Sequence, residues 1–142
     1  MSEELNIEIL KSCFVIPVHD DPIYDNRLKM EFDILKQNNF LWFIKRFVEI
    51  FNVYIKPHLY LLRGSAGSSL LLYYLGINQI DPVKYNIPLS RFINSLALTI
   101  PDFDMDLPLS LRDKIIEQII NNNKDTVRIS CNLHNENNKY FD

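Results

Sequence analysis

The 142-residue sequence has few of the residues that mark several common classes of protein. Its two cysteines, Cys13 and Cys131, lie far apart and outside any Cys-x-x-Cys or zinc-ligand pattern, which argues against a disulfide scaffold or a zinc site. No apolar run approaches the roughly 20 residues needed to cross a bilayer. Residues 1–9 are acidic and polar, unlike a secretory signal. We therefore expect a cytoplasmic protein that does not contact a membrane.

Clusters of basic residues are also lacking. The chain has 15 Lys and Arg against 18 Asp and Glu, and Lys45–Arg46 is the one adjacent basic pair. Proteins that hold a DNA duplex by its phosphates usually present a basic face. The composition therefore does not predict strong unaided DNA binding. What the chain does have is 47% apolar and 12% aromatic residues, enough to form the core of one domain.

The spacing of apolar residues predicts a mixed α/β fold, a small sheet backed by helices. The expected helices are Asn26 to the break at Asn38–Asn39, Phe40–Phe51, Ser69–Leu75, Leu89–Asn94 and one capped by Ser110 with Asp113 as its capping-box partner. The expected strands are His58–Leu62, Asp102–Leu107 and Val127–Cys131. Leu111, Ile115, Ile116, Ile119 and Ile120 are expected on the apolar face of the last helix. We divide the chain into an N-terminal segment (residues 1–25), a main domain (26–131) and a polar, frayed tail (132–142).

A Gly-Ser turn, Arg63–Ser69, joins the first expected strand to a helix and contains two of the three glycines. Glycine lets backbone amides approach a ligand closely, and such turns form polarised pockets for phosphate. Ser65, Ser68 and Ser69 add hydroxyl donors, and the Arg63 guanidinium suits a phosphate oxygen. The turn is not a Walker A loop, because no Gly-Lys-Ser/Thr ends it. A Gly-Ser turn also occurs simply as a connection, so this motif alone does not establish a site.

The second motif is an acidic segment, Asp102–Asp106, in which aspartates alternate with apolar residues. In a strand this alternation places Asp102, Asp104 and Asp106 on one face. Neighbouring carboxylates repel each other unless a cation is present, and oxygen ligands favour Mg²⁺ or Mn²⁺. Two such ions are a common device for moving a phosphoryl or nucleotidyl group. The alternative is an exposed edge strand whose acids lie in water.

The two motifs together offer a site for a triphosphate and a site for its metal, as in polymerase beta-like nucleotidyltransferase palms. At this point the chain resembles the bacterial DNA polymerase III alpha subunit family. The family pattern reads GRGSAAGSL, then LGIT, DP, FERFLNPER and PDFDxDF. The matching residues here are Arg63–Leu70, Tyr73, Leu75–Ile77, Asp81–Pro82, Tyr85, Arg91–Phe92, Asn94 and Pro101–Asp106.

The resemblance implies a palm domain at residues 26–131 with the roles of a DNA-directed DNA polymerase. Asp102 and Asp104 would be catalytic, and with Asp106 they would hold Mg²⁺ or Mn²⁺. A nucleoside triphosphate and primed DNA would be the partners. The expected nucleotide-binding residues are Arg63, Gly64, Ser65, Ser68, Ser69 and Arg91.

The sequence also departs from the family pattern. Tyr60–Leu62 replaces Gly-Pro-Gly, the second glycine of the turn is displaced by one residue, and Ser90 replaces the Glu of FERF. By the resemblance, a third catalytic acid and the fingers would lie beyond residue 142. We therefore expect no primer extension by this chain alone. Two other hypotheses remain open, a non-catalytic remnant or interaction module, and one part of a split polymerase completed by a second chain.

Overall fold

The computed structural model describes residues 2–94, 101–123, 131–132 and 140–141. In these segments the chain forms five α-helices and two small antiparallel sheets of two strands each. The helices are α1 (Glu3–Ser12), α2 (Pro22–Gln37), α3 (Leu41–Ile50), α4 (Leu70–Tyr74) and α5 (Leu109–Asn122). The strands are β1 (Leu61–Arg63), β2 (Asp104–Asp106), β3 (Cys131–Asn132) and β4 (Tyr140–Phe141). Shorter helical turns are η1 (Phe51–Ile55), η2 (Gly64–Ser68) and η3 (Leu89–Arg91).

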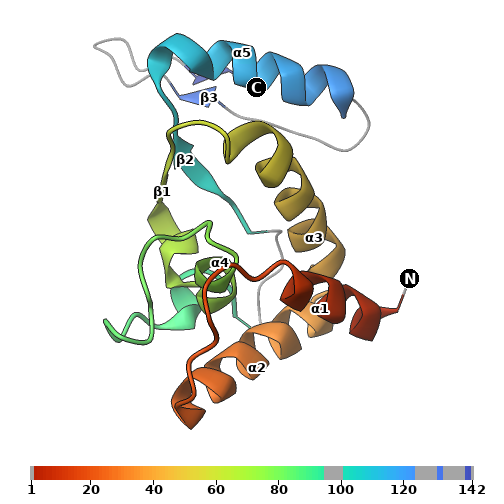
Figure 1. Ribbon diagram of the computed structural model, residues 1–142, viewed down its shortest axis with the longest axis vertical. Coiled ribbons are helices and arrows are strands. Elements are labelled where there is room, and N and C mark those ends of the chain that lie inside the picture. Colours follow the sequence, from red (N-terminus) through yellow and green to blue (C-terminus); the bar gives the residue numbers. More distant parts are fainter. Residues whose placement is uncertain (1, 95–100, 124–130, 133–139, 142) are drawn as a thin grey trace.

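The β1–β2 pair runs between the two ends of the molecule. Figure 1 shows α2 and α4 toward one end, and α5 beside β3 at the other. Helix α2 packs on α3 and α4, α1 packs on α3, and α5 packs on η1. The expected mixed α/β class is therefore confirmed. Most of the packing between helices involves α1, α2, α3 and α4.

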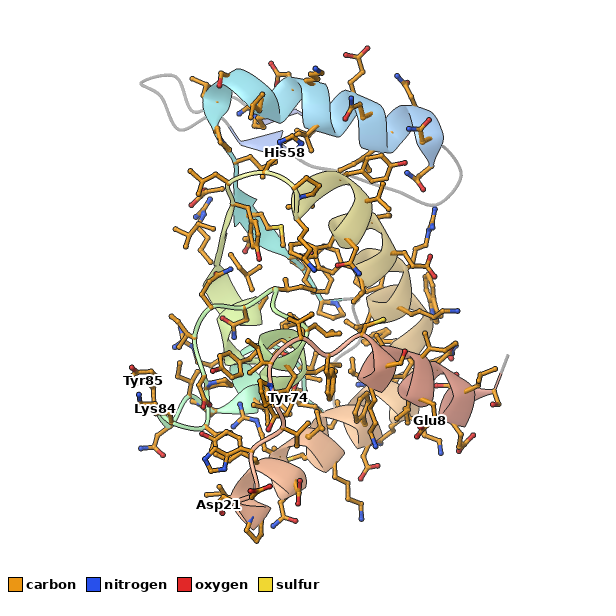
Figure 2. All side chains as sticks on the ribbon, viewed as in Figure 1. Glu8, Asp21, His58, Tyr74, Lys84 and Tyr85 are labelled. Carbon is orange, nitrogen blue, oxygen red and sulfur yellow. The ribbon has the colours of Figure 1, made fainter. Side chains whose placement is uncertain are left out.

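The core is built mainly by one apolar face of α2, one apolar face of α3 and nearly all of the short helix α4. Its buried side chains from these helices are Tyr24, Leu28, Phe32, Leu35, Leu41, Ile44, Val48, Leu70, Leu71, Leu72 and Tyr74. Tyr74 is almost fully buried, and its hydroxyl oxygen accepts a hydrogen bond from the His19 amide at 3.1 Å. Figure 2 places Tyr74 inside the molecule, and Glu8, Lys84 and Tyr85 at its periphery. The N-terminal segment is thus tied to the core of the main domain.

Two helix starts differ from the sequence-based expectation. Helix α1 was not predicted, although Ser2 caps it by accepting a hydrogen bond from Leu5 N at 3.1 Å. Helix α2 begins at Pro22 rather than Asn26, because Asp21 serves as its N-cap and proline suits the first helical turn. The polar composition of residues 1–25 concealed both signals, since capping residues are themselves polar.

The first strand also lies later than predicted. Helix α3 continues into the π-helical turn η1, in which Lys56 N donates to Phe51 O at 2.8 Å. This extra turn uses residues up to Ile55, so β1 begins at Leu61 instead of His58. The predicted strand Asp102–Leu107 is shorter as well, and only Asp104–Asp106 pair as β2.

The expected end of the domain needs three corrections. The helix expected at Leu89–Asn94 is only the 3₁₀ turn η3. Helix α5 follows Pro108, whose carbonyl accepts from Leu111 N and Arg112 N, so the Ser110–Asp113 capping box does not form. Ile115 and Ile119 are buried as predicted, but Ile120 is 42% exposed because α5 packs along one narrow stripe.

The predicted strand Val127–Cys131 lies outside the described residues except for Cys131, which belongs to β3. The tail was expected to be frayed, yet Tyr140–Phe141 forms β4 and pairs with β3. In the described part of the chain, no helix combines the length and apolar character that crossing a bilayer requires.

Candidate functional site

Pairing of β1 with β2 brings the Gly-Ser turn and the acidic segment together. The strands are antiparallel, with Leu61 opposite Asp106, Leu62 opposite Met105 and Arg63 opposite Asp104. Gly64 follows Arg63 directly and opens η2, which contacts β2. The two motifs, about 40 residues apart in the sequence, thus meet at one end of a short sheet.

Gly64 brings the backbone of the turn close to the acidic segment. Its φ is +76°, a left-handed conformation that favours glycine. A Cβ atom placed on Gly64 would lie 2.7 Å from Asp104 Oδ2. A side chain at this position would therefore push the carboxylate away from the turn unless the backbone moved.

The acidic segment alternates between solvent and core as predicted. Asp102 and Asp104 are exposed, whereas Phe103 and Met105 pack against the hydrophobic core. The Phe103 ring stacks on Phe47 with centroids 3.7 Å apart and an interplanar angle of 2°. This stack holds Phe103 against the core, so the carboxylates on either side of it remain on the surface.

Arg63 and Asp106 form an ion pair across the two strands. Arg63 Nε donates to Asp106 Oδ1 at 3.0 Å, and both side chains are nearly half exposed. Among the described residues, no group of three or more Asp, Glu, His or Cys side chains gathers as a metal site. The set of three carboxylates, Asp102, Asp104 and Asp106, therefore stays a prediction.

Asp102 and Asp104 are suitable in chemistry for a hard divalent cation. Both are solvent-exposed carboxylates, and such oxygen donors suit Mg²⁺ or Mn²⁺. A side chain at residue 64 would crowd Asp104 Oδ2, because its Cβ would lie 2.7 Å from that atom. Asp104 lies beside the Gly-Ser turn, so a cation held by this carboxylate would also lie next to the turn.

The serines of the turn occupy different environments. Ser65 is half-buried, whereas Ser68 and Ser69 are buried. Ser68 Oγ donates to Ser65 O at 2.7 Å, which closes the turn on itself. Ser69 Oγ accepts from Leu72 N at 3.0 Å and so caps α4.

The last predicted nucleotide-binding residue, Arg91, also lies beside the turn. It is exposed in η3, and η3 packs on η2.

A residue that the sequence reading missed, Glu31 of α2, holds the end of the turn. Its side chain is fully buried. Its carboxylate accepts from Ser69 Oγ at 2.7 Å, Leu70 N at 2.7 Å and Leu71 N at 3.3 Å. Arg27 Nε lies 3.7 Å from Glu31 Oε2. The available signal was a carboxylate on the apolar face of a helix, with an arginine four residues earlier.

Burial raises the pKa of Glu31 to about 7, although the hydrogen bonds from Ser69, Leu70 and Leu71 and the charge of Arg27 oppose this shift. In the unfolded chain a glutamate titrates near pH 4.3. Between these two values the folded protein binds a proton that the unfolded chain has lost. The free energy of unfolding should therefore fall as the pH rises from about 4.5 to about 7.

We expect the ionisation of Glu31 to lower the free energy of unfolding by roughly 2–3 kcal/mol between pH 5 and pH 8. This pH dependence should disappear in Glu31→Gln, because glutamine does not titrate. The measurement is urea denaturation of both proteins at pH 5, 6, 7 and 8. Wild type should lose stability relative to the variant as the pH rises. A difference that is the same at all four pH values would contradict the assignment.

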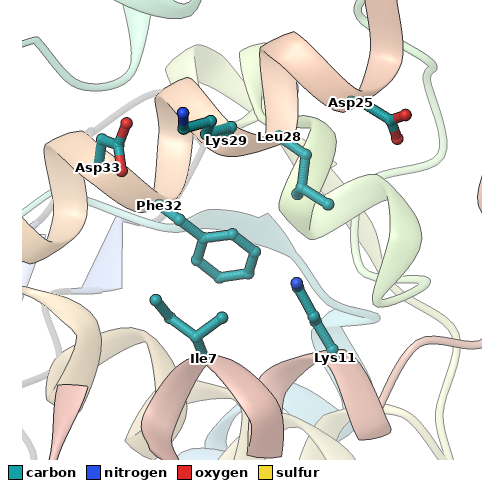
Figure 3. Close-up of a pocket in the computed structure, with 7 residues that line it drawn as sticks. All are labelled: Ile7, Lys11, Asp25, Leu28, Lys29, Phe32 and Asp33. Carbon is teal, nitrogen blue, oxygen red and sulfur yellow. The ribbon is translucent and has the colours of Figure 1, made fainter. Parts of the chain in front are cut away.

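A separate pocket lies between α1 and α2, away from the turn. It has a volume of about 380 Å³ and is lined by Ile7, Lys11, Asp25, Leu28, Lys29, Phe32 and Asp33. Figure 3 shows Lys11 and Phe32 facing each other across it, and the ammonium lies 5.8 Å from the ring centroid. Its two lysines and two aspartates balance in charge, and none of the predicted site residues lines it.

Comparisons with known proteins agree with the motifs assembled here. Residues 4–136 match the family model described as "Bacterial DNA polymerase III alpha NTPase domain". The chain is 36% identical over 106 residues to a DNA polymerase III subunit alpha of Staphylococcus epidermidis, a match that covers 70% of this chain and 10% of that protein. It is 32% identical over 104 residues to the subunit of Vibrio cholerae and 31% identical over 122 residues to that of Bacillus subtilis. These matches cover 69% and 82% of this chain, and 9% and 10% of the two subunits. The chain thus spans about a tenth of the length of these relatives.

Proposed function

Because this chain belongs to the bacterial DNA polymerase III alpha family, we propose that it carries the nucleotide- and metal-binding surface of a polymerase palm. In this role it serves metal-dependent nucleotidyl transfer in DNA replication. The observation that carries the proposal is the contact between Gly64 and the Asp104 carboxylate, which joins the Gly-Ser turn to the acidic segment. A triphosphate and its metal ion need such adjacent sites, because Asp102 and Asp104 would hold the ion and the ion would supply positive charge beside the phosphates.

The residues divide into those that reach the ligand and those that hold the turn. Arg63, Gly64, Ser65 and Arg91 are exposed or half-buried and are assigned to the phosphates. Ser68 and Ser69 are buried and bonded internally, and are assigned to the shape of the turn. Arg63 already pairs with Asp106. A phosphate that binds Arg63 would therefore replace Asp106 as its partner or shift the pair.

Asp102 and Asp104 would hold Mg²⁺ or Mn²⁺. A bound ion of this kind polarises phosphoryl oxygens and stabilises the charge that develops during nucleotidyl transfer. The residues of the chain itself bind and orient the triphosphate. The partners in this proposal are a nucleoside triphosphate and primed DNA, together with a second chain if the polymerase is split.

Isothermal titration with Mn²⁺, in the presence and absence of a deoxynucleoside triphosphate, tests this proposal. We expect the triphosphate to bind only with the metal, and Asp104→Asn to weaken Mn²⁺ binding at least about tenfold, because a neutral amide replaces an anionic ligand. Asp20→Asn is the matched control, since Asp20 is equally exposed but lies far from the turn in sequence and outside the predicted site. Equal Mn²⁺ affinities of wild type and Asp104→Asn would refute the metal assignment.

We further propose that the chain binds nucleotide without extending a primer by itself. Two-metal transfer needs carboxylates that hold both ions, and this proposal assigns only Asp102 and Asp104 to a metal. The assay is a primed template with four deoxynucleotides and Mn²⁺, beside an Asp102→Asn/Asp104→Asn double variant. Extension by wild type that disappears in the double variant would overturn this expectation.

A further inference from the structure

Three carbonyl groups at the end of the Gly-Ser turn are held by side chains from outside it. Arg27 Nη2 donates to Ser68 O at 2.7 Å. Asn78 Nδ2 donates to Gly67 O at 3.0 Å and to Ser69 O at 3.3 Å. Carbonyl oxygens carry partial negative charge and would repel a phosphate. Their hydrogen bonds to Arg27 and Asn78 therefore keep this negative charge directed toward the protein.

The first amides of α4 are likewise occupied. Leu70 N and Leu71 N donate to the two carboxylate oxygens of Glu31, and Leu72 N donates to Ser69 Oγ. A phosphate at this place would meet an internal anion that is fully buried. The phosphates of a bound nucleotide are thereby confined to the earlier part of the turn, beside Gly64 and Asp104.

A continuous path of contacts links Glu31 to that earlier part. Glu31 accepts from Ser69 Oγ, Ser69 follows Ser68 in the chain, and Ser68 Oγ donates to Ser65 O at 2.7 Å. Arg27 contacts this path at two points, because it pairs with Glu31 and donates to Ser68 O. It also donates to Ile87 O at 2.8 Å, which ties the turn to the segment before η3.

We propose that Glu31 is a positioning residue for the triphosphate, which acts through Ser69 and Ser68 to hold Gly64 and Ser65 in the shape that receives the phosphates. This inference rests on the proposed function, since it assigns a cause to the geometry of the same site. Glu31 does not touch the nucleotide or the metal. Its carboxylate supplies the anion that the start of α4 requires, and so excludes phosphate from it.

The test compares wild type, Glu31→Gln and the control Asp33→Asn at pH 8. The substitution Glu31→Gln keeps the shape of the side chain but places an NH₂ group against one of the donors that Glu31 now accepts from. Asp33 lies on the same helix and is exposed, which makes it a matched control. Three quantities are measured for each protein: the affinity for Mn²⁺ alone, the affinity for a deoxynucleoside triphosphate with saturating Mn²⁺, and the hydrogen-exchange protection of the Leu70 and Leu71 amides.

We expect Glu31→Gln to bind the triphosphate about tenfold more weakly, as for loss of one charged hydrogen bond, with reduced protection of Leu70 and Leu71. Its affinity for Mn²⁺ should equal that of wild type, because Asp102 and Asp104 make no contact with Glu31. Unchanged triphosphate affinity in Glu31→Gln would overturn the inference alone. If Glu31→Gln weakened the binding of Mn²⁺ and of the triphosphate to the same extent, Glu31 would only support the general structure, and the inference would be overturned as well. A wild type that binds no triphosphate would overturn the proposed function, and the inference with it.

Discussion

Gly64→Val is expected to abolish metal-dependent triphosphate binding. Valine is strongly disfavoured at the φ of +76° that Gly64 adopts, and its Cβ would lie 2.7 Å from Asp104 Oδ2. The carboxylate can rotate away to relieve this contact, but it then leaves the turn. We expect triphosphate affinity to fall by more than about 100-fold and the free energy of unfolding to fall by roughly 1–3 kcal/mol. Titration calorimetry and urea denaturation measure the two effects.

The turn contains its own control for this substitution. A Cβ added to Gly67 would meet no atom within 4 Å, and Gly67 does not adopt a positive φ. Gly67→Ala should therefore bind the triphosphate as wild type does. If Gly64→Val and Gly67→Ala weaken binding equally, the effect comes from general loosening of the turn, and the contact between Gly64 and Asp104 has no special role.

Arg27→Met is expected to have the largest effect on stability. The Arg27 side chain is only 13% exposed, and it provides the positive charge beside the buried Glu31. Its loss leaves an uncompensated carboxylate and removes the donor to Ser68 O and Ile87 O. Removing one partner of a buried ion pair commonly lowers the free energy of unfolding by about 3–5 kcal/mol. We expect Arg27→Met to lower it by an amount in this range at pH 8.

The double variant Arg27→Met/Glu31→Leu should recover part of this loss, because no unpaired charge remains. Lys36→Met serves as the comparison for a surface pair, since Lys36 and its partner Glu4 are 47% and 72% exposed. Its effect on the free energy of unfolding should be small, because water screens an exposed ion pair. An Arg27→Met effect of this same small size would show that Glu31 needs no counter-charge.

Local sequence patterns predicted the elements that frame the candidate site. The alternation in Asp102–Asp106 correctly placed Asp102 and Asp104 on the surface and Phe103 toward the core. Gly76, directly after the predicted helix Ser69–Leu75, adopts a left-handed φ of +77°, which is common where a helix ends at glycine. These features depend on neighbouring residues, so periodicity and glycine chemistry suffice to predict them.

Contacts between distant segments could not be predicted in this way. The register that sets Arg63 opposite Asp104 depends on the pairing of two strands, and no spacing within either strand specifies it. From the sequence, Ser69 is likewise expected to bind a ligand. Its hydroxyl bonds a glutamate 38 residues earlier, a contact that appears only when α2 packs on α4.

The charge compensation of the three carboxylates Asp102, Asp104 and Asp106 also could not be predicted from the local sequence. Repulsion among three carboxylates suggested a cation as the compensating charge. In the structure, part of the compensation for Asp106 comes from Arg63 on the neighbouring strand. Sequence order gave no reason to pair these two residues, because the pair forms only through the β1–β2 sheet.

The central claim is that the Gly-Ser turn and the acidic segment form one metal–triphosphate site. Paramagnetic broadening of backbone amide signals by Mn²⁺, recorded by NMR with a deoxynucleoside triphosphate, tests it most directly. We predict that the signals of Gly64, Ser65 and Asp104 broaden together at low Mn²⁺, while those around Glu8 in α1 remain sharp. Broadening centred on another exposed acidic stretch, such as Asp20–Asp21, with Gly64 and Asp104 unaffected, would contradict the account.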